Sequence, residues 1–245
     1  KKQAPIAKEA GRNVQEREAL KIKNNIQTFE NRVKSYSLEF AKKPLFDYAT
    51  GIDAAYTSIR ATREELLKHD ADLADLASYA RIFEFPELVE PAKAVLEKSH
   101  QELQQMVQMW HNVNMIDLQI DDWKKTLWDS IDCESIDEGA KGLYKQLRAT
   151  DKFVKGTNTY TTCEQNLKNF LATIPLVSDL RHPSMRERHW SMLMDLTGVK
   201  FVIDENFKLE DLIALQLHKF EDDVGEIVNR AQKEEKMEQA LKKIG

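Results

Sequence analysis

Hydrophobic residues recur at helical spacing along most of the chain. Near the start, apolar side chains follow one another at steps of three or four residues and form one stripe of an amphipathic helix: Ile22, Ile26, Phe29, Val33, Tyr36 and Phe40. We expect this helix to end before Pro44, because the residue before a proline avoids the α conformation. Two further helices are predicted over about residues 53–68 and 70–83.

The longest apolar stripe lies in the middle of the chain and predicts one long helix. It should start between Pro86 and Pro91, since proline is tolerated in the first turn of a helix. Its apolar positions recur without a break: Leu103, Val107, Trp110, Val113, Ile116, Ile120, Trp123, Leu127 and Ile131. Such a stripe is about 42 Å long at 1.5 Å per residue, which predicts an all-α fold built as an elongated array of antiparallel helical bundles. Trp110 and Trp123 should anchor helix–helix interfaces, because a buried tryptophan removes ~200 Å² from water.

Helix-start signals divide the rest of the sequence. Three stretches begin with Ser or Thr and carry Glu three residues later, which is the pattern of a capping box. They predict helices over about residues 135–151, 161–174 and 184–197, and Gly198 is well placed to close the last of these. A final long helix is expected over residues 217–244.

Composition excludes several classes of protein. Gly and Pro number 8 and 6 in 245 residues, which argues against a sandwich, a barrel or a Gly-rich nucleotide-binding fold. No apolar run approaches the roughly 18 residues that span a bilayer, so neither a transmembrane helix nor a membrane partner is expected. The net charge of −5 speaks against nucleic-acid binding. Residues 1–43 nevertheless carry 11 Lys/Arg against 5 Glu, which is typical of a solvated helix face or of a helix that contacts an acidic partner.

The sequence shows no constellation of catalytic, cofactor-binding or metal-ligating residues. There is no G-x-x-x-x-G-K-[ST] phosphate loop and no H-E-x-x-H pair. The single Glu-x-x-His match, at Glu97 and His100, lacks the second pair that a di-iron bundle needs. Cys133 and Cys163 are too few for a disulfide framework or a zinc site and are expected to be reduced. From chemistry alone we predict a helical interaction module.

One short segment has a sequence pattern that is far more distinctive than the apolar spacing of the helices around it. Residues 180–190 read L-R-H-P-S-M-R-E-R-H-W and residues 193–199 read L-M-D-L-T-G-V. In physical terms they form a short basic helix with caps, core positions and surface ion pairs. We expect Arg186 or Arg188 to pair with a carboxylate on a neighbouring helix, while Trp190 packs into the bundle.

These strings closely resemble dynein heavy chains, whose pattern is L-R-[polar]-P-[small]-[apolar]-R-x-R-H-W followed by L-M-x-x-T-G-V. The resemblance covers residues 85–245 and, more loosely, residues 1–84. The stretch F-E-F-P-E-L at residues 83–88 looks more like axonemal than cytoplasmic heavy chains. Two positions depart from the pattern: His182 replaces the usual Asn or Asp, and Lys208 replaces a small hydroxylated residue. Both departures concern helix starts.

The resemblance implies a mechanical role. In dynein heavy chains this region joins the tail to the linker, a helical lever that arches over the AAA+ ring. It implies that residues 1–84 form the end of the tail as a helical bundle, and residues 85–245 the tail-to-linker junction and the N-terminal part of the linker. The segment itself would not be an enzyme and would need no cofactor, since ATP and Mg²⁺ bind in the AAA+ ring of the parent chain. The residues expected to have structural or junction roles are Pro183, Arg186, Arg188, His189, Trp190, Gly198, Trp110 and Trp123.

The resemblance also implies partners and a location. The partners would be the rest of the heavy chain, other heavy chains, intermediate and light chains and, indirectly, microtubules, in the cytoplasm, the cytoskeleton and the cilium axoneme. A spectrin-like or vesicle-tethering scaffold with coiled-coil character would explain the composition and the periodicity equally well, but not the R-x-R-H-W string. A stand-alone enzyme with a metal site in the bundle core is disfavoured by the missing ligand pairs.

Overall fold

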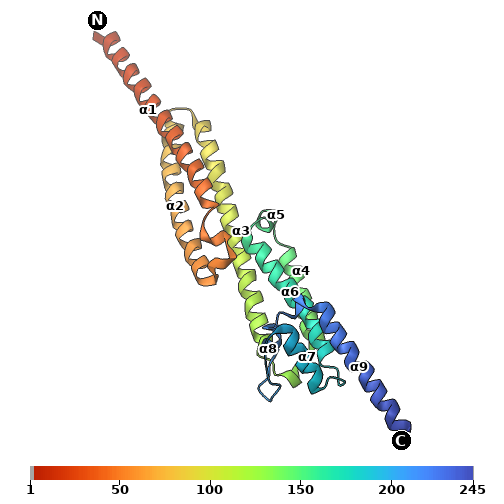
Figure 1. Ribbon diagram of the computed structural model, residues 1–245. Coiled ribbons are helices and arrows are strands. Elements are labelled where there is room, and N and C mark those ends of the chain that lie inside the picture. Colours follow the sequence, from red (N-terminus) through yellow and green to blue (C-terminus); the bar gives the residue numbers. More distant parts are fainter. Residues whose placement is uncertain (1–2, 245) are drawn as a thin grey trace. The chain divides into compact units, whose positions relative to one another are not determined.

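The computed structural model describes the backbone of residues 3–244 (Figure 1). Its regular elements are α-helices and short 3₁₀ turns, with no β-strand in this range, which confirms the predicted all-α class. The chain divides into two compact units. Unit 1 comprises residues 1–111 and 151–160, and unit 2 comprises residues 112–150 and 161–245. The predicted boundary between residues 84 and 85 remains a prediction.

Unit 1 is built from α1 (Gln3–Phe40), α2 (Ile52–Ile82), the first part of α3 (Glu90–Lys124) and α5 (Lys152–Lys155). Five of the six members of the stripe predicted for α1 are buried in the core of this unit, and the sixth, Tyr36, is partly exposed; the buried members are Ile22, Ile26, Phe29, Val33 and Phe40. The helix ends at Phe40, before Pro44, as predicted. The apolar spacing therefore correctly indicated which face of α1 packs against its neighbours.

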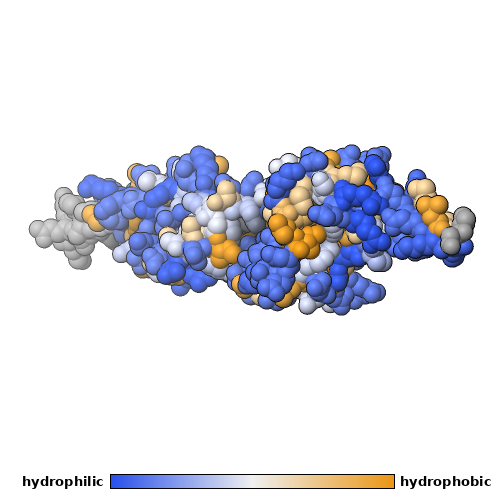
Figure 2. All heavy atoms as spheres, turned by 60° about the horizontal axis from the view of Figure 1, so that its bottom comes forward, coloured by the Kyte–Doolittle hydropathy of each residue, from blue (hydrophilic) through white to orange (hydrophobic). Residues whose placement is uncertain are grey.

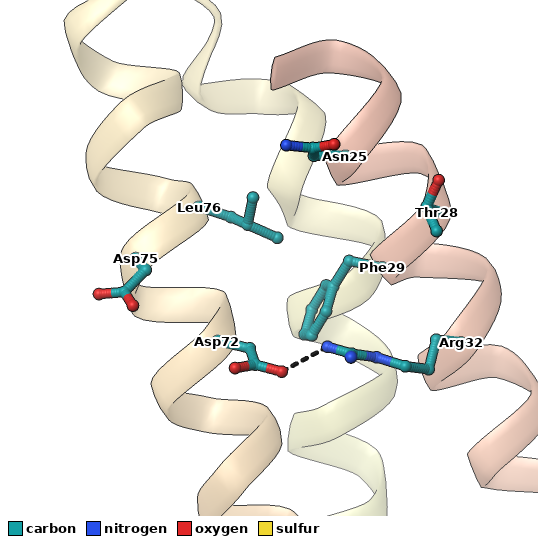
Figure 3. A pocket seen from close by; sticks show the side chains of 7 residues that line it. All are labelled: Asn25, Thr28, Phe29, Arg32, Asp72, Asp75 and Leu76. Atoms are coloured by element: carbon teal, nitrogen blue, oxygen red, sulfur yellow. Dashed lines mark hydrogen bonds and ion pairs between the residues drawn. The ribbon is translucent and has the colours of Figure 1, made fainter. Parts of the chain in front are cut away.

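A shallow groove runs along α1 and α2 in unit 1 (Figure 3). Its mouth is crossed by an ion pair between Arg32 of α1 and Asp72 of α2. The Arg32 guanidinium lies over the Phe29 ring, 5.0 Å from the ring centroid. The groove therefore joins two helices through a cation–π contact and an exposed ion pair, and it gathers no set of catalytic groups.

Trp110 is the largest fully buried side chain among the described residues of unit 1. It has no exposed surface, and its indole N–H donates to the carbonyl oxygen of Leu45 at 2.7 Å. The hydroxyl of Thr159 donates to the same oxygen at 3.3 Å. The ring of Tyr48 stacks on the indole at a centroid distance of 6.4 Å. Helix α3 is thus tied to the turn after α1 and to the start of α6 (Asn158–Leu180).

Two predicted helix boundaries in the first half of the chain are wrong. Residues 53–83 do not form two helices, because α2 runs unbroken from Ile52 to Ile82. This stretch contains neither Gly nor Pro, so nothing in its sequence interrupts the backbone hydrogen bonds. Conversely, α3 ends at Lys124, and the last two members of the predicted stripe, Leu127 and Ile131, lie beyond it.

The early end of α3 has a tertiary cause. The N–H of Trp128 donates to the carbonyl of Phe207 at 2.8 Å, and the N–H of Leu209 donates to that of Thr126 at 3.0 Å. These bonds form an isolated antiparallel bridge between Leu127 and Lys208. The chain therefore leaves the helix to pair with a segment 81 residues further along, from Leu127 to Lys208, which local periodicity cannot show.

Unit 2 contains the rest of α3 and α6 together with α4 (Cys133–Arg148), α7 (Glu187–Thr197), α8 (Leu209–Ile213) and α9 (Glu221–Ile244). Its core combines buried residues from α4, α6, α7, α8 and α9: Ile136, Phe170, Ile174, Val177, Leu193, Leu212 and Val228. Each of these side chains is at most 5% exposed. Trp123 and Trp190 pack against this core while remaining partly exposed.

The three predicted capping boxes are wrong. The cap of α4 is Asp132, whose side chain accepts from the N–H of Ser135 at 3.1 Å. Helix α6 begins at Asn158, upstream of Thr161. Ser184 lies outside α7, which begins at Glu187. Each helix starts two or three residues away from its predicted first residue, and the Ser/Thr-x-x-Glu pattern recurs by chance in a chain so rich in Glu.

Two helices also extend differently from the prediction. Helix α6 continues through Pro175 to Leu180. Pro175 is exposed, whereas Ile174 and Leu176 beside it are buried, so the lost hydrogen bond lies on the solvent side of a helix held by its core face. Helix α9 begins at Glu221 because the backbone of Gln216 is left-handed and residues 217–219 form a 3₁₀ turn.

Substitution of Gly139 tests the packing of α4 against α3. The ring of Trp123 stacks on Phe170 at 5.7 Å and covers Gly139, where an added Cβ would lie 2.7 Å from the indole. We expect Gly139→Ala to lower the free energy of unfolding by about 1 kcal/mol, because overpacking outweighs the better helix propensity of alanine. Gly142 of the same helix faces open space, so Gly142→Ala should stabilise by up to about 1 kcal/mol. Chemical denaturation that shifts both variants in the same direction would contradict this packing.

Candidate functional site

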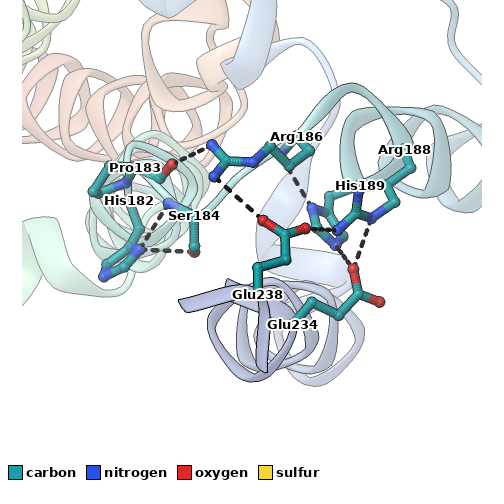
Figure 4. A network of polar contacts seen from close by, with 8 residues as sticks. All are labelled: His182, Pro183, Ser184, Arg186, Arg188, His189, Glu234 and Glu238. Carbon is teal, nitrogen blue, oxygen red and sulfur yellow. Dashed lines mark hydrogen bonds and ion pairs between the residues drawn. The ribbon is translucent and has the colours of Figure 1, made fainter. Parts of the chain in front are cut away.

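The R-x-R-H-W string lies at the start of α7, which packs against α9 (Figure 4). The guanidinium of Arg188 contacts two carboxylates one helical turn apart on α9. Its Nε lies 2.7 Å from Oε2 of Glu234, and its Nη2 lies 3.0 Å from Oε1 of Glu238. A planar cation that spans two carboxylates fixes both the rotation and the position of α9 against α7.

His189 completes the contact from a fully buried position. Its side chain has no exposed surface, and its Nδ1 accepts from the backbone N–H of Arg186 at 3.1 Å. Its Nε2 lies 3.0 Å from Oε2 of Glu234. Since Nδ1 accepts, Nε2 carries the proton and donates to Glu234, so the neutral imidazole uses both nitrogens. The same ring therefore caps the first turn of α7 and holds α9.

Arg186 links this contact to the turn that precedes α7. Its Nη1 donates to the carbonyl of Pro183 at 3.1 Å, and its Nη2 lies 3.9 Å from Glu238. Ser184 is buried and its hydroxyl lies 2.7 Å from Nδ1 of His182, so it stabilises the turn and does not cap α7. We call the five side chains that join α7 to α9 the α7–α9 clamp: Arg186, Arg188, His189, Glu234 and Glu238.

The charge of Glu234 is strongly stabilised. Hydrogen bonds from Arg230, Arg188 and His189 outweigh the effect of burial and lower the pKa of this carboxyl to about 2. An unfolded chain would titrate Glu near pH ~4.3, so the clamp contributes stability above that pH and loses it as the pH falls towards 2. We expect Glu234→Gln to destabilise the chain at neutral pH and to have little effect near pH ~2. The urea concentrations at the unfolding midpoints of the parent and of Glu234→Gln are compared across this pH range. A difference between the two midpoints that does not shrink in acid would contradict the role of Glu234.

The opposite side of α7 is aromatic. The ring of Trp190 meets those of Trp128 and Phe201 edge to face, at centroid distances of 5.8 and 6.2 Å. Phe207 contacts both Trp128 and Phe201, at 5.8 and 5.6 Å. We call these four rings the aromatic cluster. Helix α7 therefore has polar contacts with α9 on one side and ring contacts on the other.

Gly198 ends α7 in the left-handed conformation, with φ of 72°. A side chain at this position would be strained, so the Thr-Gly step of the string is required by backbone geometry. The structure thus brings together six of the predicted junction residues around α7: Pro183, Arg186, Arg188, His189, Trp190 and Gly198. Trp123 packs elsewhere in unit 2, and Trp110 belongs to unit 1.

The acidic half of the clamp was not identified from the sequence. Glu234 and Glu238 are spaced so that both lie on one face of a helix, but many acidic pairs in this chain share that spacing.

No group of three or more His, Cys, Asp or Glu residues suited to a metal ion occurs in the described part of the chain. Within the same residues, none of the helices combines the length and the apolar character that crossing a bilayer requires.

A family model and individual known proteins match this chain and agree with one another. Residues 96–245 match the family model of the dynein heavy chain, N-terminal region 2. The chain is 41% identical over its whole length to the flagellar outer arm dynein alpha chain of Chlamydomonas reinhardtii. It is 36% identical, over 94% of its length, to the outer arm beta chain of the same organism, and 30% identical, over 91%, to human dynein axonemal heavy chain 17. It spans about 5% of the length of each of these relatives.

These relatives are flagellar and axonemal heavy chains, which confirms the axonemal resemblance seen at residues 83–88. The family model covers the R-x-R-H-W string, the aromatic cluster and both sides of the α7–α9 clamp. Only the first 95 residues lie outside it, and the outer arm alpha chain aligns with them as well. The chain therefore belongs to the dynein heavy chain family, as part of its N-terminal region.

Proposed function

We propose that this chain is a non-catalytic mechanical segment of a dynein heavy chain. It couples the tail to the linker lever and so transmits the ATP-driven power stroke of a microtubule motor. The observation that carries this proposal is the α7–α9 clamp, which fixes the direction of a long helix at the end of unit 2.

The clamp is well suited to bearing load because, up to residue 243, α9 has no buried apolar side chain beyond Ala231. Its buried apolar positions end at Ala231, while Met237 and Leu241 are 59% and 69% exposed. Beyond Ala231, Glu234 and Glu238 supply the hydrogen bonds and ion pairs that the structure shows between the described part of α9 and α7. The strength of such charge-assisted hydrogen bonds depends on the relative orientation of the guanidinium and carboxylate groups. A force along or across α9 would therefore pass through the clamp into α7 and its aromatic cluster.

Membership of the family supports the proposal that this segment is part of a much larger protein. The relatives are about twenty times longer than this chain, so ATP and Mg²⁺ would be bound by an AAA+ ring elsewhere in the parent heavy chain. Their names favour the axoneme of a cilium or flagellum as the location. The partners would be the rest of the heavy chain, other heavy chains, intermediate and light chains, and microtubules indirectly. Family membership favours this function over a spectrin-like or vesicle-tethering scaffold.

Substitution of Trp190 in an intact motor tests the proposal. Trp190→Ala removes ring contacts to Trp128 and Phe201 and should loosen α7. We expect slower microtubule gliding. Basal ATP hydrolysis should be largely retained, because the substitution leaves the AAA+ ring of the motor unchanged. Tyr79→Ala, at a side chain that is 53% exposed in unit 1, is the matched control and should alter neither rate. Equal loss of gliding and hydrolysis would contradict a purely mechanical role, and so would unchanged gliding by a folded Trp190→Ala motor.

A further inference from the structure

Arg181, the first residue after α6, contacts the connector between α3 and α4, which we define as residues 125–132. Its Nη1 donates to the carbonyl oxygen of Ile131, and its Nη2 donates to that of Asp129 at 3.3 Å. The same guanidinium lies over the ring of Trp128, 5.7 Å from the ring centroid. One side chain at the end of α6 therefore makes three contacts with the connector.

These contacts depend on the shape of the guanidinium more than on its charge. The surface seen in Figure 2 is largely hydrophilic, and exposed cations of this chain commonly pair with carboxylates. Arg181 is exposed too, but within the described residues it forms no ion pair with Asp or Glu. Its planar fork of donors instead spans two carbonyl oxygens while it covers an aromatic ring. A lysine has the same charge but no planar fork, so its single ammonium group cannot reproduce this geometry.

Trp128 is the member of the aromatic cluster that joins α7 to the connector. Its ring meets that of Trp190 on α7 edge to face at 5.8 Å, and its backbone N–H donates to the carbonyl of Phe207 at 2.8 Å. Its side chain is only partly buried, so Arg181 supplies contacts that a fully buried ring would obtain from the core. A continuous path of contacts therefore leads from α7 through Trp190, Trp128 and Arg181 to α6.

We propose that Arg181 is a positioning residue for force transmission, an inference that rests on the proposed function. It holds Trp128 as the fixed support against which Trp190 and α7 bear. Load that enters through the α7–α9 clamp then passes on to the connector and to α6. Without the fork, α7 would stay bound to α9 while its aromatic side yields under load. Arg181 acts through Trp128 and has no part in ATP hydrolysis.

Arg181→Lys in an intact motor tests this role, because it retains the positive charge and removes the fork. We expect microtubule gliding to slow at least about twofold, with basal ATP hydrolysis retained. Arg148→Lys is the matched control and should glide at the parent speed. Arg148 is exposed in unit 2 and lies 5.9 Å from the centroid of the Tyr144 ring, but the described structure shows no hydrogen bond from its guanidinium.

A double-mutant cycle with Trp190→Ala shows whether Arg181 acts through the aromatic cluster. We expect Arg181→Lys to slow the parent motor but to cause little further loss in the Trp190→Ala motor, because the ring contact that Arg181 supports is already gone. A merely structural role would give the same fold-loss of gliding speed in both motors and would overturn the proposal.

The remaining outcomes separate this inference from the proposed function. Unchanged gliding by a folded Trp190→Ala motor would contradict the proposed function itself. Slower gliding by Trp190→Ala together with equal speeds for Arg181→Lys and Arg148→Lys would refute the role of Arg181 alone. Limited proteolysis shows whether the segment is folded in each motor. Unfolding of the segment by Arg181→Lys would also overturn the proposal, because Arg181 would then be required for folding.

Discussion

Replacement of Trp110 by alanine is expected to lower the free energy of unfolding by about 3–5 kcal/mol. The indole is fully buried, so truncation leaves a cavity in the core of unit 1. It also removes the donor that lies 2.7 Å from the carbonyl of Leu45. Chemical denaturation monitored by circular dichroism measures the loss directly.

Two companion variants separate the causes. Trp110→Phe keeps much of the volume but not the N–H group, so it should cost less, about 1–3 kcal/mol. Thr159→Val removes the second donor to the Leu45 carbonyl and should add to the effect of Trp110→Phe more than additively, since the oxygen then loses both donors. Coincident unfolding curves for Trp110→Ala and the parent would show that this side chain does not anchor the unit.

The sequence allowed the faces of the helices to be predicted better than their ends. The stripe from Ile22 to Phe40 and the burial of Trp110 follow from spacing alone, because a helix that packs on one side must place its apolar residues there. The ends depend on choices among near-equivalent caps, as Asp132 and Ser135 illustrate. They also depend on distant pairing, as at Leu127, and neither effect is visible in a short window of sequence.

The candidate site was half predictable for a similar reason. Local sequence identified the basic residues of α7, and Gly198 had a backbone reason to follow them. The partner carboxylates could not be chosen, since Glu234 and Glu238 acquire their role only when α9 packs with that face towards Arg188. The continuation of α6 through Pro175 likewise depends on which side of the helix is buried.

Charge reversal at Arg188 is expected to have the largest effect on force transmission. Arg188→Glu places a third carboxylate beside Glu234 and Glu238, and repulsion should release the end of α9 from α7. In an intact motor we expect microtubule gliding to slow severalfold while basal ATP hydrolysis persists. Arg63→Glu, at an exposed position on α2 of unit 1, controls for the change in net charge and should leave gliding unaffected.

The most direct test of the mechanical account is to restore the clamp with exchanged charges. In the parent chain, Nη2 of Arg188 lies 3.0 Å from Oε1 of Glu238. In the Arg188→Glu, Glu238→Lys double variant, a carboxylate at position 188 faces an ammonium group at position 238. Gliding speed and basal ATP hydrolysis of the intact motor are measured side by side for the single and the double variant. The account predicts that the second substitution recovers a substantial part of the lost gliding speed, with hydrolysis constant throughout. Gliding that is unaffected by Arg188→Glu in a folded motor, or that the double variant fails to recover, would contradict it.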